Sequence, residues 1–346
     1  METPHLNKAA IVAAARLLEA GELVAFPTET VYGLGADAEN PAAIAKIYAA
    51  KGRPSNHPVI VHIASQAEAA RWAAELPEQA QRLMAAFWPG PLTLIVKRAA
   101  SVPDAVSGGQ DTIGLRCPSH PVAQALMREF KNGKGGIAAP SANKFGHVSP
   151  TTAQHVRDEF GTEDGSPLAC VLDGGQSTVG IESTIVDVSR MDSHGPVLLR
   201  PGSIGADAIA AIIGVHPTTP DREAPRVSGS LLSHYAPRSP VALVASIDCV
   251  DALQSLVARG RRVAVIAHGA ARWETTGPHS AAVTRLPDDA AGYAHGLYAA
   301  LRELDAAAPD IILVEAPPRD AAWSGVWDRL QRAAHDSTGT LQSLLA

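Results

Sequence analysis

The stretch LVAFPTETVYGLG, residues 23–35, decides the fold of the first half of the chain. Its first four residues form a short apolar run, which predicts a buried β-strand that ends at Pro27. Threonine and tyrosine hydroxyls and two glycines follow directly. Polar groups and close-approach backbone at the carboxyl end of a strand are typical of ligand sites in α/β sheets. The stretch therefore predicts a strand that carries a binding loop, although an ordinary turn with two glycines fits this stretch alone equally well.

Outward from this strand, short apolar runs alternate with helical patterns. Asn40 and Pro41 are typical of a helix start, as are Pro77 and the pair Ser149-Pro150. This mixture favours an α/β domain with a twisted open sheet over residues 1–215. Strands are expected at residues 23–26, 59–63, 92–97, 112–117, 136–140, 168–172, 181–188 and 197–199.

The composition changes after residue 215. Residues 216–240 contain five prolines and predict an extended linker. Beyond it, strands and helices alternate regularly, which favours a small Rossmann-like domain with a mostly parallel sheet over residues 241–346. Strands are expected at residues 241–245, 263–267 and 311–314, and helices at residues 249–258, 290–304 and 321–334.

Composition excludes several classes of protein. The 346 residues are 46% hydrophobic and carry a net charge of −6. A surface coated in positive charge for binding nucleic acid is therefore not expected, although this composition is compatible with a local basic cleft. The three cysteines lie far apart, which argues against a disulfide framework and a zinc site and fits a reducing compartment. No apolar run approaches the roughly 18 residues of a membrane span, and charges interrupt the N-terminal apolar residues, so we expect no signal peptide and a cytoplasmic location.

KGRPSNHP, residues 51–58, is a candidate phosphate clamp. Lys51 and Arg53 flank a glycine and precede a loop stiffened by prolines, and both side chains suit phosphate oxygens. Cations in the last turn of a helix are also favoured by the helix dipole. On spacing alone the dipole explanation is favoured by about two to one.

Further polar residues lie at predicted strand ends. PSAN at residues 140–143 and SPT at residues 149–151 could donate to phosphate, or could only be turn and capping residues. His62 and Arg116 interrupt apolar strands, where a satisfied structural role is the commoner one. No nucleophile–base frame or metal motif is present, so any chemistry is expected to depend on positioning and positive charge.

Taken in order, the motifs resemble those of the threonylcarbamoyl-AMP synthase family, which is built on a YrdC-like domain. The linker and the Rossmann-like tail resemble the two-domain branch of that family. Two departures are His57, where the family usually has Asn, and Ser228-Gly229, where it usually has Pro-Gly. The stretches that carry the resemblance are PTETVYGLGADA, KGRPSNHP, VHI, FWPGPLTLIV, TIGLRCPSHP, APSANKFGHVSPT, GIESTIVDV, LLRPGSI and, in the linker, SHYAP.

The resemblance implies an active site on the concave face of the first domain, where Lys51 and Arg53 act on the phosphates and Mg²⁺ arrives with ATP. No protein metal ligand is implied. The residues implied for L-threonine are Thr30, His62, Arg116, the backbone near Ala139, and Ser183. Those implied for ATP are Lys51, Arg53, His57, Thr112, Ser141, Asn143, Ser149, Arg200 and, from the linker, Tyr235.

The implied reaction condenses L-threonine, bicarbonate or CO₂, and ATP into threonylcarbamoyl-AMP and pyrophosphate. The product would serve the threonylcarbamoyl modification of the tRNA adenosine next to the anticodon, through a downstream transferase. A weak tRNA contact is among the expected partners. The alternative function is an RNA- or nucleotide-binding module without catalysis. A carbamoyl-transfer enzyme of hydrogenase maturation would need Cys clusters, which the sequence lacks.

Overall fold

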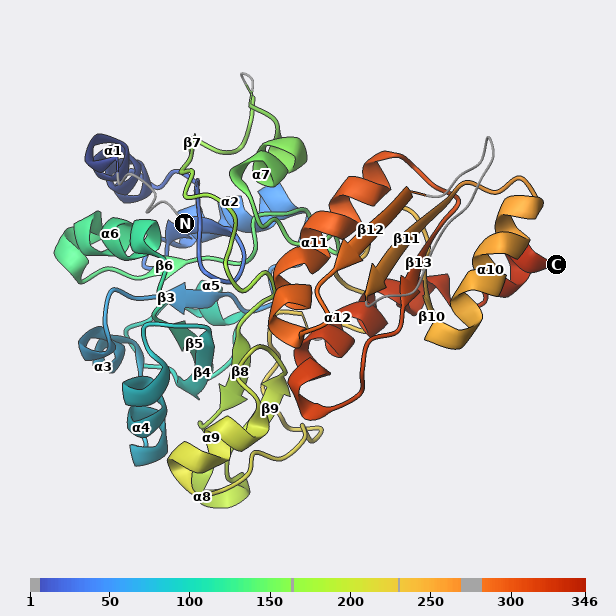
Figure 1. The fold of residues 1–346 in the computed structure, drawn as a ribbon. Helices are drawn as coiled ribbons and strands as arrows, with labels where there is room; N and C mark the ends of the chain where they lie inside the picture. The colour runs from blue at the N-terminus through green and yellow to red at the C-terminus, as the bar shows by residue number, and fades with distance from the viewer. Residues whose placement is uncertain (1–6, 163–164, 230, 269–281) are drawn as a thin grey trace. The chain divides into compact units, whose positions relative to one another are not determined.

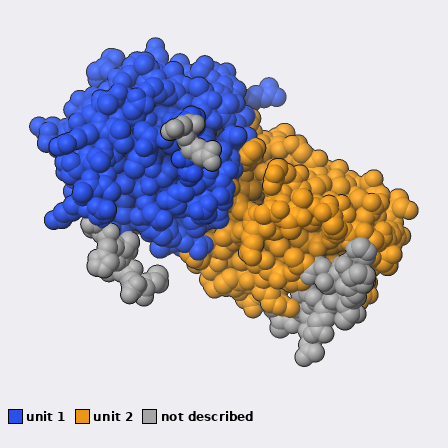
Figure 2. Space-filling model, turned by 90° about the horizontal axis from the view of Figure 1, so that it is seen from above, with its two compact units in different colours: residues 1–145, 149–230 blue, residues 146–148, 231–346 orange. Residues whose placement is uncertain are grey.

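The computed structural model describes residues 7–162, 165–229, 231–268 and 282–346. The chain divides into two compact units (Figure 2), one of residues 1–145 and 149–230 and the other of residues 146–148 and 231–346. The boundary between residues 230 and 231 falls inside the predicted linker, whereas residues 146–148, which lie in the predicted first domain, group with the second unit. None of the helices among the described residues is both long enough and apolar enough to cross a lipid bilayer.

The first unit is built on a nine-stranded mixed sheet with the order β7-β1-β2-β6-β3-β5-β4-β8-β9 (Figure 1). The pairs β1–β7, β3–β5 and β4–β8 are parallel, and the other neighbours are antiparallel. This confirms the predicted α/β class. The strands are β1 (Val24–Phe26), β2 (Gly33–Asp37), β3 (Ile60–His62), β4 (Leu92–Lys97), β5 (Thr112–Arg116), β6 (Ile137–Ala138), β7 (Cys170–Val171), β8 (Thr184–Asp187) and β9 (Val197–Arg200).

Helix α2 shows why the elements begin and end where they do. Asn40 caps it by accepting from the amides of Ala42 and Ala43, and Gly52 ends it in the left-handed conformation at φ 61°.

The predicted start of α7 was wrong: the helix begins at Ala153, and the cap is Thr152. The α-helices of this unit are α1 (Lys8–Glu19), α2 (Pro41–Lys51), α3 (Ala69–Trp72), α4 (Glu78–Phe87), α5 (Asp104–Ser107), α6 (Pro121–Glu129), α7 (Ala153–Phe160), α8 (Met191–His194) and α9 (Ala206–Ile213).

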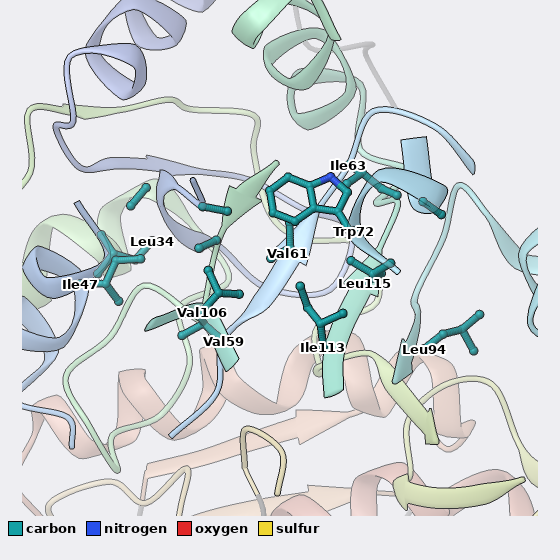
Figure 3. Close-up of a cluster of buried hydrophobic side chains, with 14 of the residues drawn as sticks. Leu34, Ile47, Val59, Val61, Ile63, Trp72, Leu94, Val106, Ile113 and Leu115 are labelled. Carbon is teal, nitrogen blue, oxygen red and sulfur yellow. The ribbon is translucent and has the colours of Figure 1, made fainter. Parts of the chain in front are cut away.

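Apolar side chains cover both faces of β1. Leu23 and Ala25 join the large core around Trp72 (Figure 3), while Val24 and Phe26 join a second cluster against α1 and α6. A strand buried on both faces has an uninterrupted apolar sequence, which is what residues 23–26 show.

The second unit has a four-stranded, all-parallel sheet with the order β10-β13-β11-β12. This confirms the predicted Rossmann-like pattern, but the sequence interpretation missed β12. The strands are β10 (Val241–Val244), β11 (Val263–His268), β12 (Ala282–Leu286) and β13 (Ile311–Glu315), and the α-helices are α10 (Ser246–Ala258), α11 (Ala290–Ala306), α12 (Ser324–Ala334) and α13 (Thr340–Leu345).

Candidate active site

One face of the first unit's sheet carries the candidate site. Thr112, Gly114 and Arg116 alternate along β5, so they share a face, while Ile113 and Leu115 enter the large core (Figure 3). Thr112 and Arg116 are about 13 Å apart at roughly 3.3 Å per residue. The face is therefore long enough for two ligand groups, one toward each end of β5.

The floor between these two ends is apolar. Ile60 on β3 and Ile95 on β4 both stand opposite Gly114, and Ile185 on β8 stands opposite Thr93. Ile95 and Ile185 form a small buried cluster with Val227, a residue of the predicted linker. Gly114 has no side chain, and the nearest atom to a Cβ built there would be Ile95 Cδ1 at 3.2 Å. The missing side chain lets Ile95 lie close over the middle of the face, and Val227 packs onto this floor.

Lys51 anchors the end of the site that is predicted to bind phosphate. Its buried ammonium donates to the carbonyl oxygens of Ser141 at 2.6 Å and Asn143 at 2.5 Å. Burial, followed by the charge of nearby Arg53, moves the pKa of Lys51 well below its usual value. A bound anion would offset both effects, so this end is suited to a phosphate group.

Arg53 follows α2, and its side chain reaches across the loop of residues 53–58. Its Nη2 donates to the Pro58 carbonyl at 3.0 Å and to Ser228 Oγ at 3.2 Å. Ser228 in turn donates to the Pro58 carbonyl and accepts from Arg200 through its own carbonyl at 2.9 Å. The structure thus brings two predicted ATP residues, Arg53 and Arg200, onto one linker residue.

Two further predicted ATP residues contact groups that the sequence interpretation did not single out. Ser149 Oγ donates to the buried carboxylate of Glu182 at 2.5 Å. The ring of His57 packs edge-on against Phe145, with 5.6 Å between centroids. Burial, then the charges of Arg53 and Arg226, lowers the pKa of His57, so its neutral form is favoured.

Tyr235 belongs to the second unit. Its ring lies beneath the Arg329 guanidinium, 5.3 Å from the centroid, and 5.8 Å from the ring of Tyr298. Its contact with a nucleotide stays a prediction.

Arg116 and His62 form the other end of the site, because the register of the parallel pair β3–β5 places them side by side. Arg116 Nη2 forms an ion pair with Glu29 Oε1 at 2.7 Å, and both side chains are about 95% buried. The motif around Glu29 was noticed in the sequence, but this residue was given no role. A buried guanidinium beside a neutral ring can receive a carboxylate.

His62 is a buried neutral imidazole. Burial, and then the charge of Arg116, lowers its pKa to about 3. Its Nδ1 has no hydrogen-bond partner among the residues that the structure describes. A buried polar atom without a partner costs about 1–3 kcal/mol, which a ligand donor or acceptor would offset.

The depressed pKa of His62 makes the stability of the chain pH-dependent. Between pH 3 and 6.5 the unfolded chain binds a proton here that the folded chain does not, so acid favours unfolding. We expect the free energy of unfolding to fall by about 2 kcal/mol more in the wild type than in His62→Gln between pH 6.5 and 4.5. Urea titrations at both pH values measure this. As a control, replacing the exposed His216 by Gln should leave the pH dependence of the unfolding free energy as in the wild type. If that pH dependence were the same in the wild type and in His62→Gln, the depressed pKa of His62 would be contradicted.

The other residues predicted for L-threonine lie at nearby strand ends. Thr30 Oγ1 is 2.9 Å from Thr28 Oγ1, and the Ala139 amide donates to the Ile60 carbonyl. Ser183 Oγ is 2.7 Å from Thr93 Oγ1 and accepts from Arg200 Nη2 at 3.1 Å. Ser183 and Arg200 therefore connect the two ends of the site.

These features define an α/β protein with a buried cationic face on a mixed sheet. The chain belongs to the Sua5/YciO/YrdC family, described as "Telomere recombination", whose sequence model matches residues 16–202. The model described as "Threonylcarbamoyl-AMP synthase, C-terminal domain" matches residues 204–335.

Full-length relatives agree with this assignment. The chain is 38% identical to a threonylcarbamoyl-AMP synthase of Pyrococcus abyssi over 332 residues, which cover 93% of each chain. It is 41% identical to that of Bacillus subtilis over 340 residues, or 95% of this chain and 94% of the relative. The crystal structure of P. abyssi Sua5 complexed with L-threonine matches with a TM-score of 0.85 and 34% identity, covering 96% of both chains.

Proposed function

We propose that this chain is a threonylcarbamoyl-AMP synthase. The observation that carries the proposal is the buried Arg116–His62 pair, in a chain that matches an L-threonine-bound relative over 96% of its length. Arg116 would receive the threonine carboxylate, and Thr30, Ser183 and the backbone near Ala139 would surround the rest of the amino acid. Thr112, Ser141, Asn143, Ser149 and Arg200 would hold ATP together with Lys51, Arg53 and His57.

The proposed chemistry needs a neutral threonine amine. A buried site disfavours the ammonium form, so it helps the amine to attack CO₂, with release of a proton, or bicarbonate, with release of water. The resulting carbamate is short-lived in water, and enclosure protects it. One carbamate oxygen then attacks the α-phosphorus of ATP, and pyrophosphate leaves.

Positive charge would stabilise the departing pyrophosphate. Lys51 and Arg53 are buried near one another, at the end of the face opposite to Arg116. Fixed cations of this kind stabilise charge that develops in the transition state. Magnesium belongs to the substrate in this proposal: it would enter bound to the ATP phosphates and neutralise part of their charge.

Several partners follow from this proposal. The product would pass to a threonylcarbamoyl transferase that modifies the tRNA adenosine next to the anticodon, and a weak tRNA contact belongs to the same proposal. The cytoplasm is the compartment we propose, because Cys117, Cys170 and Cys249 are free thiols.

Pyrophosphate release tests the proposed function. The purified chain is assayed with ATP and Mg²⁺, and L-threonine and bicarbonate are omitted in turn. We expect release only when both are present. Release that is indifferent to L-threonine would contradict the proposal and indicate a different acceptor.

A further inference from the structure

Glu29 is a buried carboxylate for which the mechanism above has no use. It lies in the loop between β1 and β2, and 4% of its surface is exposed. One carboxylate oxygen pairs with Arg116 Nη2 at 2.7 Å, and the other accepts from the Ser119 amide at 3.0 Å. Two contacts from separate parts of the chain therefore fix this negative charge beside the group expected to receive the substrate carboxylate.

The charges at this end of the site are otherwise one-sided. Of the residues assigned to L-threonine, Arg116 carries the only full positive charge, and none carries a negative one. Arg200 brings further positive charge to the same end through its contact with Ser183. Without Glu29 the site would attract any small carboxylate. With Glu29, the ion pair has no net charge.

We propose that Glu29 is the specificity-determining residue that makes the site select a zwitterion rather than a simple carboxylate. Arg116 attracts the substrate carboxylate, and Glu29 attracts the ammonium group on the adjacent carbon. The same carboxylate repels acids that lack this ammonium group. The inference rests on the proposed binding of L-threonine at Arg116 and His62, and it concerns how the amino acid enters, before the amine loses its proton.

Two ligands separate the charge effect from a structural one. L-threonine and (R)-3-hydroxybutyrate differ only in the α-amine, so their ratio of dissociation constants reports on that group. In Glu29→Gln the negative charge is lost, and we expect threonine to bind about tenfold more weakly and 3-hydroxybutyrate several-fold more tightly. Glu29→Asp keeps the charge and should keep most of the preference for threonine. A purely structural role would instead weaken both ligands by the same factor.

Isothermal titration calorimetry on the full chain measures these constants, with thermal unfolding as a check of folding. The proposal is supported if the threonine preference falls by about thirty- to fiftyfold in Glu29→Gln, the product of the two expected changes, and is largely retained in Glu29→Asp. An unchanged ratio in Glu29→Gln overturns it. If that variant does not fold, the wild type alone decides, because 3-hydroxybutyrate binding as tightly as threonine also overturns it. Wild-type protein that binds neither ligand would contradict the proposed function itself.

Discussion

Lys51→Met is expected to lower pyrophosphate release by about 10²–10³-fold, the loss typical of removing one donor that stabilises transition-state charge. The Lys51 ammonium also donates to the carbonyls of Ser141 and Asn143, so the loop that carries these two residues loses both hydrogen bonds in the same variant. Methionine fills a similar volume without charge. The fold should therefore survive, at a cost of about 1–3 kcal/mol for the carbonyls left without a donor.

Lys46→Met is the matched control for this prediction. Lys46 lies on the same helix, but it is exposed and pairs with Glu22 at the surface. Surface pairs of this kind contribute about 0–1 kcal/mol, so activity should stay near that of the wild type. Steady-state kinetics with ATP varied compares the two variants. Activity of Lys51→Met within twofold of the wild type would remove Lys51 from the proposed phosphate clamp.

Arg116→Met carries the second large effect. Removing one partner of a buried charge pair costs about 3–5 kcal/mol, because Glu29 would keep a buried charge without its cation. The threonine carboxylate loses its partner in the same variant. We therefore expect both a less stable chain and a threonine KM raised by about 10²-fold or more, in line with about 2–5 kcal/mol for a buried charge contact.

A double variant separates these two losses. Glu29→Gln with Arg116→Met removes both charges, so stability should largely return while threonine binding does not. Arg71→Met, which breaks an exposed pair with Glu39, is the control for loss of an arginine. Thermal unfolding and threonine-dependent kinetics give both readouts. Recovery of threonine binding in the double variant would show that Arg116 does not receive the carboxylate.

The sequence was most informative where local pattern and environment agree. Residues 23–26 are apolar throughout, and the strand they form is buried on both faces. The alternating strands and helices after residue 241 likewise predicted a parallel sheet. Strand β12 was missed because its burial is partial, with Ala282 and Arg285 exposed and only Leu286 fully buried.

The candidate site was less accessible to sequence reasoning, because its contacts join distant residues. Glu29 meets Arg116 from 87 positions away, and no local pattern marks a glutamate between two threonines. Val227 is one apolar residue in a proline-rich segment, yet it packs onto the isoleucines of the sheet. The family motifs supplied the candidate residues, whose roles stay predictions, but pairings such as Ser149 with Glu182 depend on tertiary structure.

The most direct test of the central claim follows the carbon of bicarbonate. The chain is incubated with ATP, Mg²⁺, L-threonine and ¹³C-bicarbonate, and the nucleotide products are separated and weighed by mass spectrometry. We predict an AMP conjugate that contains threonine and one labelled carbon, formed together with pyrophosphate. Pyrophosphate with a threonine conjugate that lacks the label, or with AMP alone and no conjugate, would contradict the account.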